Sequence, residues 1–194
     1  MTYVLRPTET RFNMWVCYEE GSSLSLRDDM MRLACSECGR VAPDAILAME
    51  SVAVSGFRPD FGLMTKTTDN YNVFGPNMLE ALTECNVGGL LYVPIDGSNG
   101  SCLAFPKHLV HADISQMKEP KGRCSVCARP FSAVGRVGVV GVLDKFEIYG
   151  LAAEHFTGVS GYRHLLCNDD VASVLSSHGC ESVLQDISTV AVFL

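Results

Sequence analysis

The spacing of apolar positions predicts a chain of short strands and short helices. Residues 3–5 and 14–18 are rich in aromatic and branched side chains, which is typical of strands. Residues 24–33 repeat apolar positions at helical spacing after two serines that can cap a helix. Residues 137–143 form an apolar run broken by glycines, and this run predicts a buried strand rather than a phosphate-binding loop.

Two segments of the chain, residues 71–93 and 163–185, follow the same order of apolar and polar positions. When they are aligned at a shift of 92, Leu79 meets Val171 and Leu82 meets Val174. Each segment predicts a strand, a short helix, a glycine turn and a second strand. A helix of about ten residues is not stable alone in water, so we expect all four apolar side chains to be buried against a sheet.

The ends of the two predicted helices carry recognisable signals. Pro76 and Asn77 can begin the first helix, and Asn168 or Asp169 can cap the second. Glycine after the last apolar position can end each of them, and Gly179 does so in the second segment.

These patterns together predict an α+β fold made of two pseudo-repeated halves that pack as one unit. Residues 1–116 would form the N-terminal half and residues 117–194 the C-terminal half, each with one CxxC motif and one strand-helix-strand unit. Residues 117–123 contain lysine, proline and glycine and are the expected linker between the halves.

The composition excludes several classes of protein. With 47% hydrophobic and 19% charged residues the chain has enough apolar content to fold, and its apolar runs are far shorter than the roughly 20 residues that span a membrane. The amino terminus lacks the pattern of a signal peptide, so we expect a cytoplasmic protein. A formal net charge of −7 disfavours a nucleic-acid binder and suits a basic partner.

Four of the nine cysteines form two CxxC motifs, Cys35 with Cys38 and Cys124 with Cys127. Two residues between cysteines let both thiolates bind one ion, and two such pairs make the tetrahedral four-cysteine site typical of structural zinc. Gly39 suits the turn after the first pair, whereas Ala128 follows the second. The 85 residues between Cys38 and Cys124 exceed the usual zinc-ribbon spacing, so the fold would have to bring the pairs together.

Other interpretations of these cysteines remain open. His108 and His111 precede Cys124 closely enough for a mixed site of two histidines with Cys124 and Cys127. A redox dithiol would need a CxxC at the start of a helix, which neither motif favours, and the thiols could also hold no metal. We expect the five isolated cysteines to be structural: Cys17, Cys85, Cys102, Cys167 and Cys180.

The sequence holds no recognisable catalytic motif. A serine elbow, an HExxH helix and a phosphate loop are all missing, and the other histidines fit surface or cap positions, so we do not expect an enzyme. Basic residues around the second CxxC support an alternative, a zinc-ribbon nucleic-acid-binding or regulatory protein: Lys118, Lys121, Arg123, Arg129 and Arg136.

The two CxxC motifs, Cys35-Ser-Glu-Cys38-Gly39 and Cys124-Ser-Val-Cys127, lie 89 positions apart, and a strand-helix-strand segment follows the second. This plan resembles the double-CxxCG proteins, a bacterial family in which several members are assigned as immunity partners of polymorphic toxins. The resemblance implies zinc ligands at Cys35, Cys38, Cys124 and Cys127. It also implies a binding protein that neutralises a cognate toxin, expected to be basic, by forming a direct complex with it.

Overall fold

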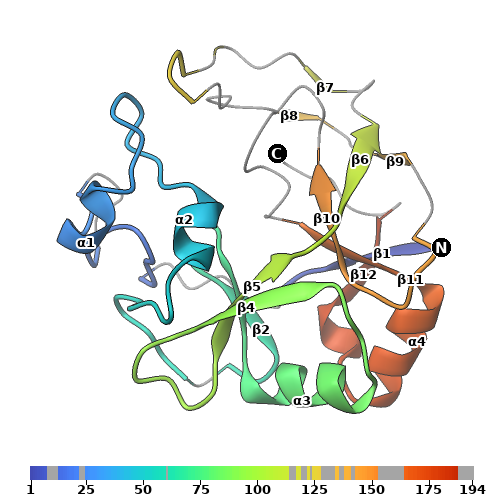
Figure 1. Ribbon diagram of the computed structural model, residues 1–194. Coiled ribbons are helices and arrows are strands. Elements are labelled where there is room, and N and C mark those ends of the chain that lie inside the picture. The colour runs from blue at the N-terminus through green and yellow to red at the C-terminus, as the bar shows by residue number, and fades with distance from the viewer. Residues whose placement is uncertain are drawn as a thin grey trace.

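The computed structural model describes residues 1–7, 13–21, 25–59, 61–113, 117–118, 122, 124–127, 134–135, 138–140, 143–152 and 164–187. These residues form a mixed α and β structure with two main sheets (Figure 1). None of the helices in these ranges has the length and apolar character needed to cross a membrane.

The larger sheet has six strands and contains both the first and the last of the described strands. Their order across the sheet is β12 (Leu184–Asp186), β1 (Thr2–Leu5), β11 (Leu165–Asn168), β10 (Tyr149–Ala152), β6 (Leu109–Asp113) and β9 (Gly138–Val140). β1 pairs antiparallel with both β11 and β12, whereas β10 and β6 are parallel. The sheet therefore joins strands from both predicted halves.

The smaller sheet has four antiparallel strands in the order β2 (Met64–Lys66), β3 (Asn72–Phe74), β5 (Cys102–Pro106) and β4 (Leu90–Pro94). A separate ladder pairs β7 (Met117–Lys118) with β8 (Val134–Gly135), so the expected linker begins with a short strand. The described residues of the predicted strand 137–143 are those of β9, at an edge of the larger sheet, and Leu143, which belongs to no strand.

Both segments compared in the sequence contain a strand, a nine-residue helix and a second strand. Helix α3 (Pro76–Glu84) connects β3 to β4, and helix α4 (Asp169–Ser177) connects β11 to β12 through the short 3-10 helix η2 (Glu181–Val183). In each unit the two strands run parallel, with one antiparallel strand between them, β5 in the first and β1 in the second. The helices begin at Pro76 and Asp169, a shift of 93 rather than 92.

The signals at the helix starts act as expected, and so does one of the two stop signals. Pro76 occupies the first turn of α3, and the side-chain oxygen of Asn168 accepts a hydrogen bond of 3.0 Å from the Val171 N–H at the start of α4. Gly179 (φ 77°) adopts the left-handed conformation that ends α4, as expected, whereas after α3 Asn86 (φ 53°) does so in place of the expected glycine.

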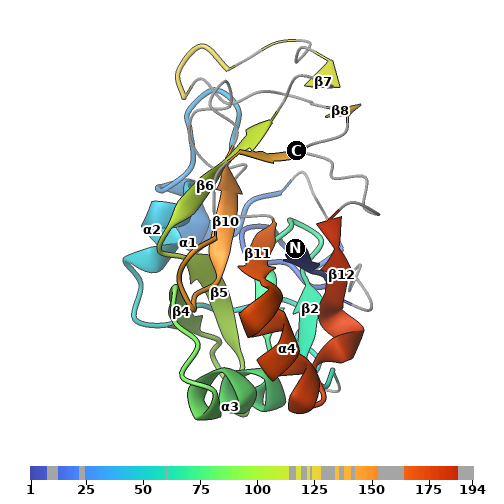
Figure 2. The ribbon, with the colours of Figure 1, turned by 90° about the vertical axis from the view of Figure 1, so that its right-hand side faces the viewer.

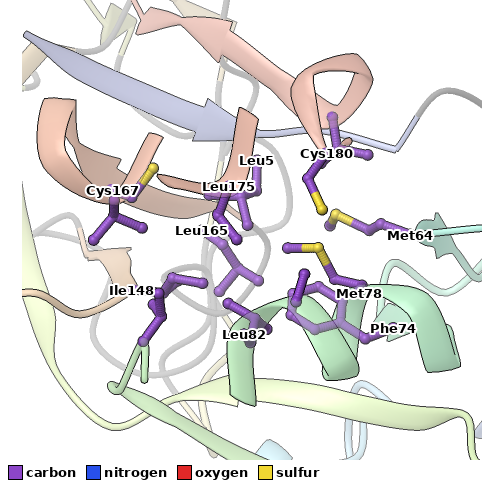
Figure 3. Packing of buried hydrophobic residues seen from close by; sticks show 14 of the residues in the cluster. Leu5, Met64, Phe74, Met78, Leu82, Ile148, Leu165, Cys167, Leu175 and Cys180 are labelled. Atoms are coloured by element: carbon purple, nitrogen blue, oxygen red, sulfur yellow. The ribbon is translucent and has the colours of Figure 1, made fainter. Parts of the chain in front are cut away.

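The two helices pack into one hydrophobic core with residues of both sheets, shown in Figure 3. Met78 and Leu82 of α3 and Val171 and Leu175 of α4 are at most 2% exposed. The prediction for the apolar positions was right for Leu82 and Val171 and wrong for full burial of Leu79 and Val174, which are half-buried. The alignment was one residue out, because the fully buried positions of the two helices, Met78 with Val171 and Leu82 with Leu175, are 93 positions apart.

A second core lies against the smaller sheet and supports the region of the first CxxC motif. It includes Met30 of helix α1 (Asp28–Met31) and Ile46 of helix α2 (Pro43–Leu47), which lie on either side of that motif. The helix expected over residues 24–33 is therefore shorter than predicted. Residues 14–18 are not a regular strand but make isolated bridges from Trp15 to Ser55 and from Tyr18 to Leu26.

Candidate metal centre

The fold brings the four cysteines of the two CxxC motifs into one cluster. Their sulfur atoms all lie within 4.8 Å of one another. The Cys35 and Cys124 sulfurs are 3.7 Å apart, and the Cys38 and Cys127 sulfurs are 3.6 Å apart. Figures 1 and 2 show the two loops, in blue and in yellow, at the same end of the molecule. Cys124 is buried and the other three are half-buried, so the cluster could hold a metal ion away from bulk water.

The first CxxC loop is a tight turn closed by its own backbone. A bridge between Ala34 and Val41 forms its base, and the Cys35 N–H donates to the Arg40 carbonyl at 3.0 Å. The Gly39 N–H donates to the Cys35 carbonyl at 2.9 Å, with Gly39 at a φ of 68°. That left-handed angle explains why glycine follows the second cysteine.

Backbone N–H groups favour the thiolate form of the first cysteine in each motif. The N–H groups of Cys38 and Glu37 lower the pKa of Cys35 to about 6. In the second loop the N–H groups of Cys127 and Val126 act on Cys124 in the same direction. Burial and the neighbouring thiols outweigh them there, so the pKa of Cys124 is raised.

Cys38 has the opposite preference to Cys35. Burial raises the pKa of Cys38 to about 12, and the surrounding thiols of Cys127, Cys35 and Cys124 act in the same direction. Several thiolates so close together would need a positive charge between them, and a divalent metal ion would supply that charge.

Glu37 links the two loops and was not identified from the sequence. Its carboxylate accepts a hydrogen bond from the Ser125 hydroxyl and lies 3.8 Å from the Cys124 sulfur. No spacing rule connects Glu37 to Ser125, because the contact exists only after the two loops have come together. The pair holds the second loop against the first independently of the sulfur atoms.

The structure does not bring His108 to the cysteines. The His108 Nε2 atom lies 3.6 Å from the Glu147 carboxylate, and its ring packs near that of Tyr149. Within the described residues the group of possible ligands contains only the four cysteines. His111 is on β6, and its side chain lies outside the described residues.

The first CxxC motif does not begin a helix, and the described residues 124–127 of the second form a turn. Helix α1 ends at Met31, before Cys35, and α2 begins at Pro43, after Cys38. Sulfur atoms of different loops lie close together, Cys35 with Cys124 at 3.7 Å and Cys38 with Cys127 at 3.6 Å. This arrangement suits a shared ion better than a dithiol within one motif.

The five isolated cysteines are free thiols in or beside the two cores. Burial raises the pKa of Cys17 and of Cys167 to about 12, and it also raises the pKa of Cys180. Cys85 and Cys102 are half-buried. These surroundings keep all five protonated at neutral pH and fit a packing role.

The remaining predicted features are spread over the molecule or lie outside the described part. His178 follows α4 and His164 precedes β11, while His155 is not among the described residues. The side chains of the basic group around the second CxxC also lie outside the described residues. In comparisons of this chain with protein-family models, curated proteins and solved structures, no match was found.

Proposed function

We propose that the four-cysteine cluster is a closed structural zinc site. The observation that carries the proposal is the convergence of four sulfur atoms within 4.8 Å from loops 89 positions apart. At the usual Zn–S distance of about 2.3 Å, a tetrahedral ion separates its sulfur ligands by about 3.8 Å. The distances of 3.7 and 3.6 Å between the loops match that value.

The chemistry of the donors supports zinc. Four soft thiolates in a tetrahedral arrangement are typical of zinc or iron–sulfur sites, and the N–H groups at Cys35 and Cys124 stabilise the negative charge of a metal–thiolate centre. The ion would cross-link the loops. Cys35, Cys38, Cys124 and Cys127 would hold it, and Glu37 with Ser125 would keep the loops in register.

Substitution of one ligand tests the site directly. We expect the purified protein to carry about one zinc ion per chain and Cys124→Ser to lose most of it. The variant should melt about 5–10 °C lower, because a structural zinc site contributes folding energy and about 2–4 °C corresponds to 1 kcal/mol at this size. Metal analysis and calorimetry measure both effects.

Two control variants make that result specific. Cys102→Ser changes a half-buried cysteine outside the cluster and should keep its metal. His108→Ala should also keep it, because His108 contacts Glu147 instead. Full metal content in Cys35→Ser and Cys124→Ser would rule out the four-cysteine site, and loss of metal from His108→Ala would favour the mixed site.

We further propose that the zinc-stabilised fold is a binding protein, and that it acts as an immunity protein against a bacterial toxin. The double-CxxC plan supports this role through its resemblance to the double-CxxCG family. The net charge of −7 supports a basic partner, because opposite charges accelerate association. In this proposal the zinc centre clamps residues 1–116 to residues 117–194, as two related halves, and the complex forms in the reducing cytoplasm.

Co-expression with the protein encoded by the neighbouring gene tests the role. We expect growth to be rescued and a stoichiometric complex to co-purify. We also expect the association rate to fall as salt concentration rises. Cys102→Ser should rescue as well as the unmodified protein, whereas Cys124→Ser should rescue poorly because less folded protein remains. Failure to rescue with no complex would refute immunity, and retention on nucleic acid at physiological salt would favour a zinc-ribbon nucleic-acid binder.

A further inference from the structure

A pocket of about 450 Å³ opens where the larger and the smaller sheet meet, away from the four cysteines. It lies beyond the end of β1, beside the end of β2 and over the start of β12, whose strands Figure 2 shows near one another. Its lining residues are Leu5, Arg6, Pro7, Lys66, Asn70, His164, Ser182, Val183, Leu184 and Gln185.

The charge of this pocket is opposite to that of the chain. Arg6 and Lys66 are cationic and His164 can be protonated, whereas no acidic residue is among the described residues that line it. The whole chain carries 22 acidic against 15 basic residues. Anions are therefore repelled by the molecule in general, and a bound anion would have to be held by these local groups.

Backbone contacts fix the positions of the polar groups. The Arg6 N–H donates to the Val183 carbonyl at 2.7 Å, and the Arg6 guanidinium donates to the Gln185 side-chain oxygen at 3.3 Å. Asn70, in the turn after β2, adopts a left-handed φ of 71°, and its N–H bond to the Thr67 carbonyl at 2.9 Å closes that turn. Arg6 is thus held by Val183 and Gln185, whereas Asn70 and Lys66 come from β2 and the turn that follows it.

The floor of the pocket is apolar, since Leu5 and Val183 are at most 2% exposed. Its volume lies in the range of small-molecule sites and is much larger than one inorganic phosphate needs. A guanidinium can bind either a phosphate or a carboxylate group through two parallel hydrogen bonds. We propose that this pocket binds a small organic anion with at least two negative charges, carried by phosphate or carboxylate groups.

Glycerol 3-phosphate and succinate are suitable probes, because one carries a phosphate group and the other carries two carboxylate groups. Neither chelates zinc strongly enough to remove it from a thiolate site. At constant ionic strength and neutral pH, we expect one of them to bind in calorimetric titrations and to shift amide NMR signals of Ser182–Gln185 and Asn70. A comparison of the two affinities shows whether the pocket prefers phosphate or carboxylate. This inference does not depend on the metal site or on a toxin partner.

Charge-removing variants locate the site. Arg6→Gln and Lys66→Gln should each weaken binding by about tenfold or more, because hydrogen bonds to charged groups contribute about 1.5–3 kcal/mol. Arg58→Gln removes an exposed arginine outside the pocket and should change affinity less than twofold. Arg6→Lys keeps the charge and should retain part of the affinity. This variant also tests the role of Arg6 if Arg6→Gln does not fold. Absence of binding by both probes, or equal weakening by Arg58→Gln, would overturn the proposal.

Discussion

Asp69 joins the amino-terminal segment to the turn after β2. Its carboxylate accepts hydrogen bonds from the Cys17 N–H at 2.8 Å and the Val16 N–H at 3.0 Å. Burial raises the pKa of Asp69 above 3.8, and the two N–H bonds and Thr67 only partly offset it. The folded state therefore holds the Asp69 proton more tightly than the unfolded state does.

The difference between the folded and unfolded pKa of Asp69 predicts a pH dependence of stability that Asp69→Asn should remove. Because the folded pKa of Asp69 is raised, its proton-linked contribution is fully present below the unfolded pKa and is lost as pH rises through the folded pKa. The free energy of unfolding of the unmodified protein minus that of Asp69→Asn should thus decrease as pH rises from about 4. Urea unfolding at several pH values measures it. A difference that stays constant or increases would show that the pKa of Asp69 is not raised.

At the scale of single elements, Asn168 does more than cap α4. Besides accepting the Val171 N–H bond, its amide donates to the carbonyls of Leu143 at 3.0 Å and Lys145 at 3.3 Å. It therefore ties the start of α4 to the segment before β10.

We expect Asn168→Ala to lower the free energy of unfolding by about 1–2 kcal/mol, through loss of the cap and of these two bonds. Asn77→Ala is the matched control, because Asn77 is exposed in the first turn of α3 and is not its N-cap residue. That change should stay within about 0.5 kcal/mol. Equal effects in urea unfolding would mean that Asn168 has no special role.

Local signals predicted the elements that depend on local chemistry. Pro76, Asn168 and Gly179 marked helix ends correctly, because capping and left-handed turns involve only neighbouring residues. Residues 14–18 misled the prediction. Their apolar side chains are buried in the second core, but burial alone does not supply a partner strand, and the structure gives them only isolated bridges.

For the molecule as a whole, the sequence indicated which cysteines would meet but not what else would join them. The spacing within each CxxC motif follows from metal chemistry and is visible in the chain. The Glu37 contact and the pocket beside Arg6 depend on segments that approach one another only in the folded protein, so neither has a signal in the sequence.

Leu5 tests whether the two sheets unfold as one unit. It is 2% exposed and lies in the core shared by α3 and α4, so Leu5→Ala should cost about 2–5 kcal/mol. The single tryptophan, Trp15, is buried in another part of the molecule and reports on that part by fluorescence. In Leu5→Ala we expect the urea midpoint measured by Trp15 fluorescence and the midpoint measured by far-UV circular dichroism to decrease by the same amount.

Leu91→Ala provides the comparison, since Leu91 on β4 is 41% exposed and should cost much less. If Leu5→Ala lowered only the circular dichroism midpoint and left the Trp15 transition in place, the sheets would be separate cooperative units.

The position of β1 has a consequence for how the protein is made. Leu5 pairs with Leu165 on one side and with Leu184 on the other, so at least 160 residues must be synthesised before this strand can acquire its first neighbour. At a translation rate of about 5–20 residues per second, β1 waits roughly 8–30 seconds with Val4 and Leu5 uncovered. The nascent chain therefore offers an apolar segment to chaperones until β11 and β12 have been made, and only then can the larger sheet be completed.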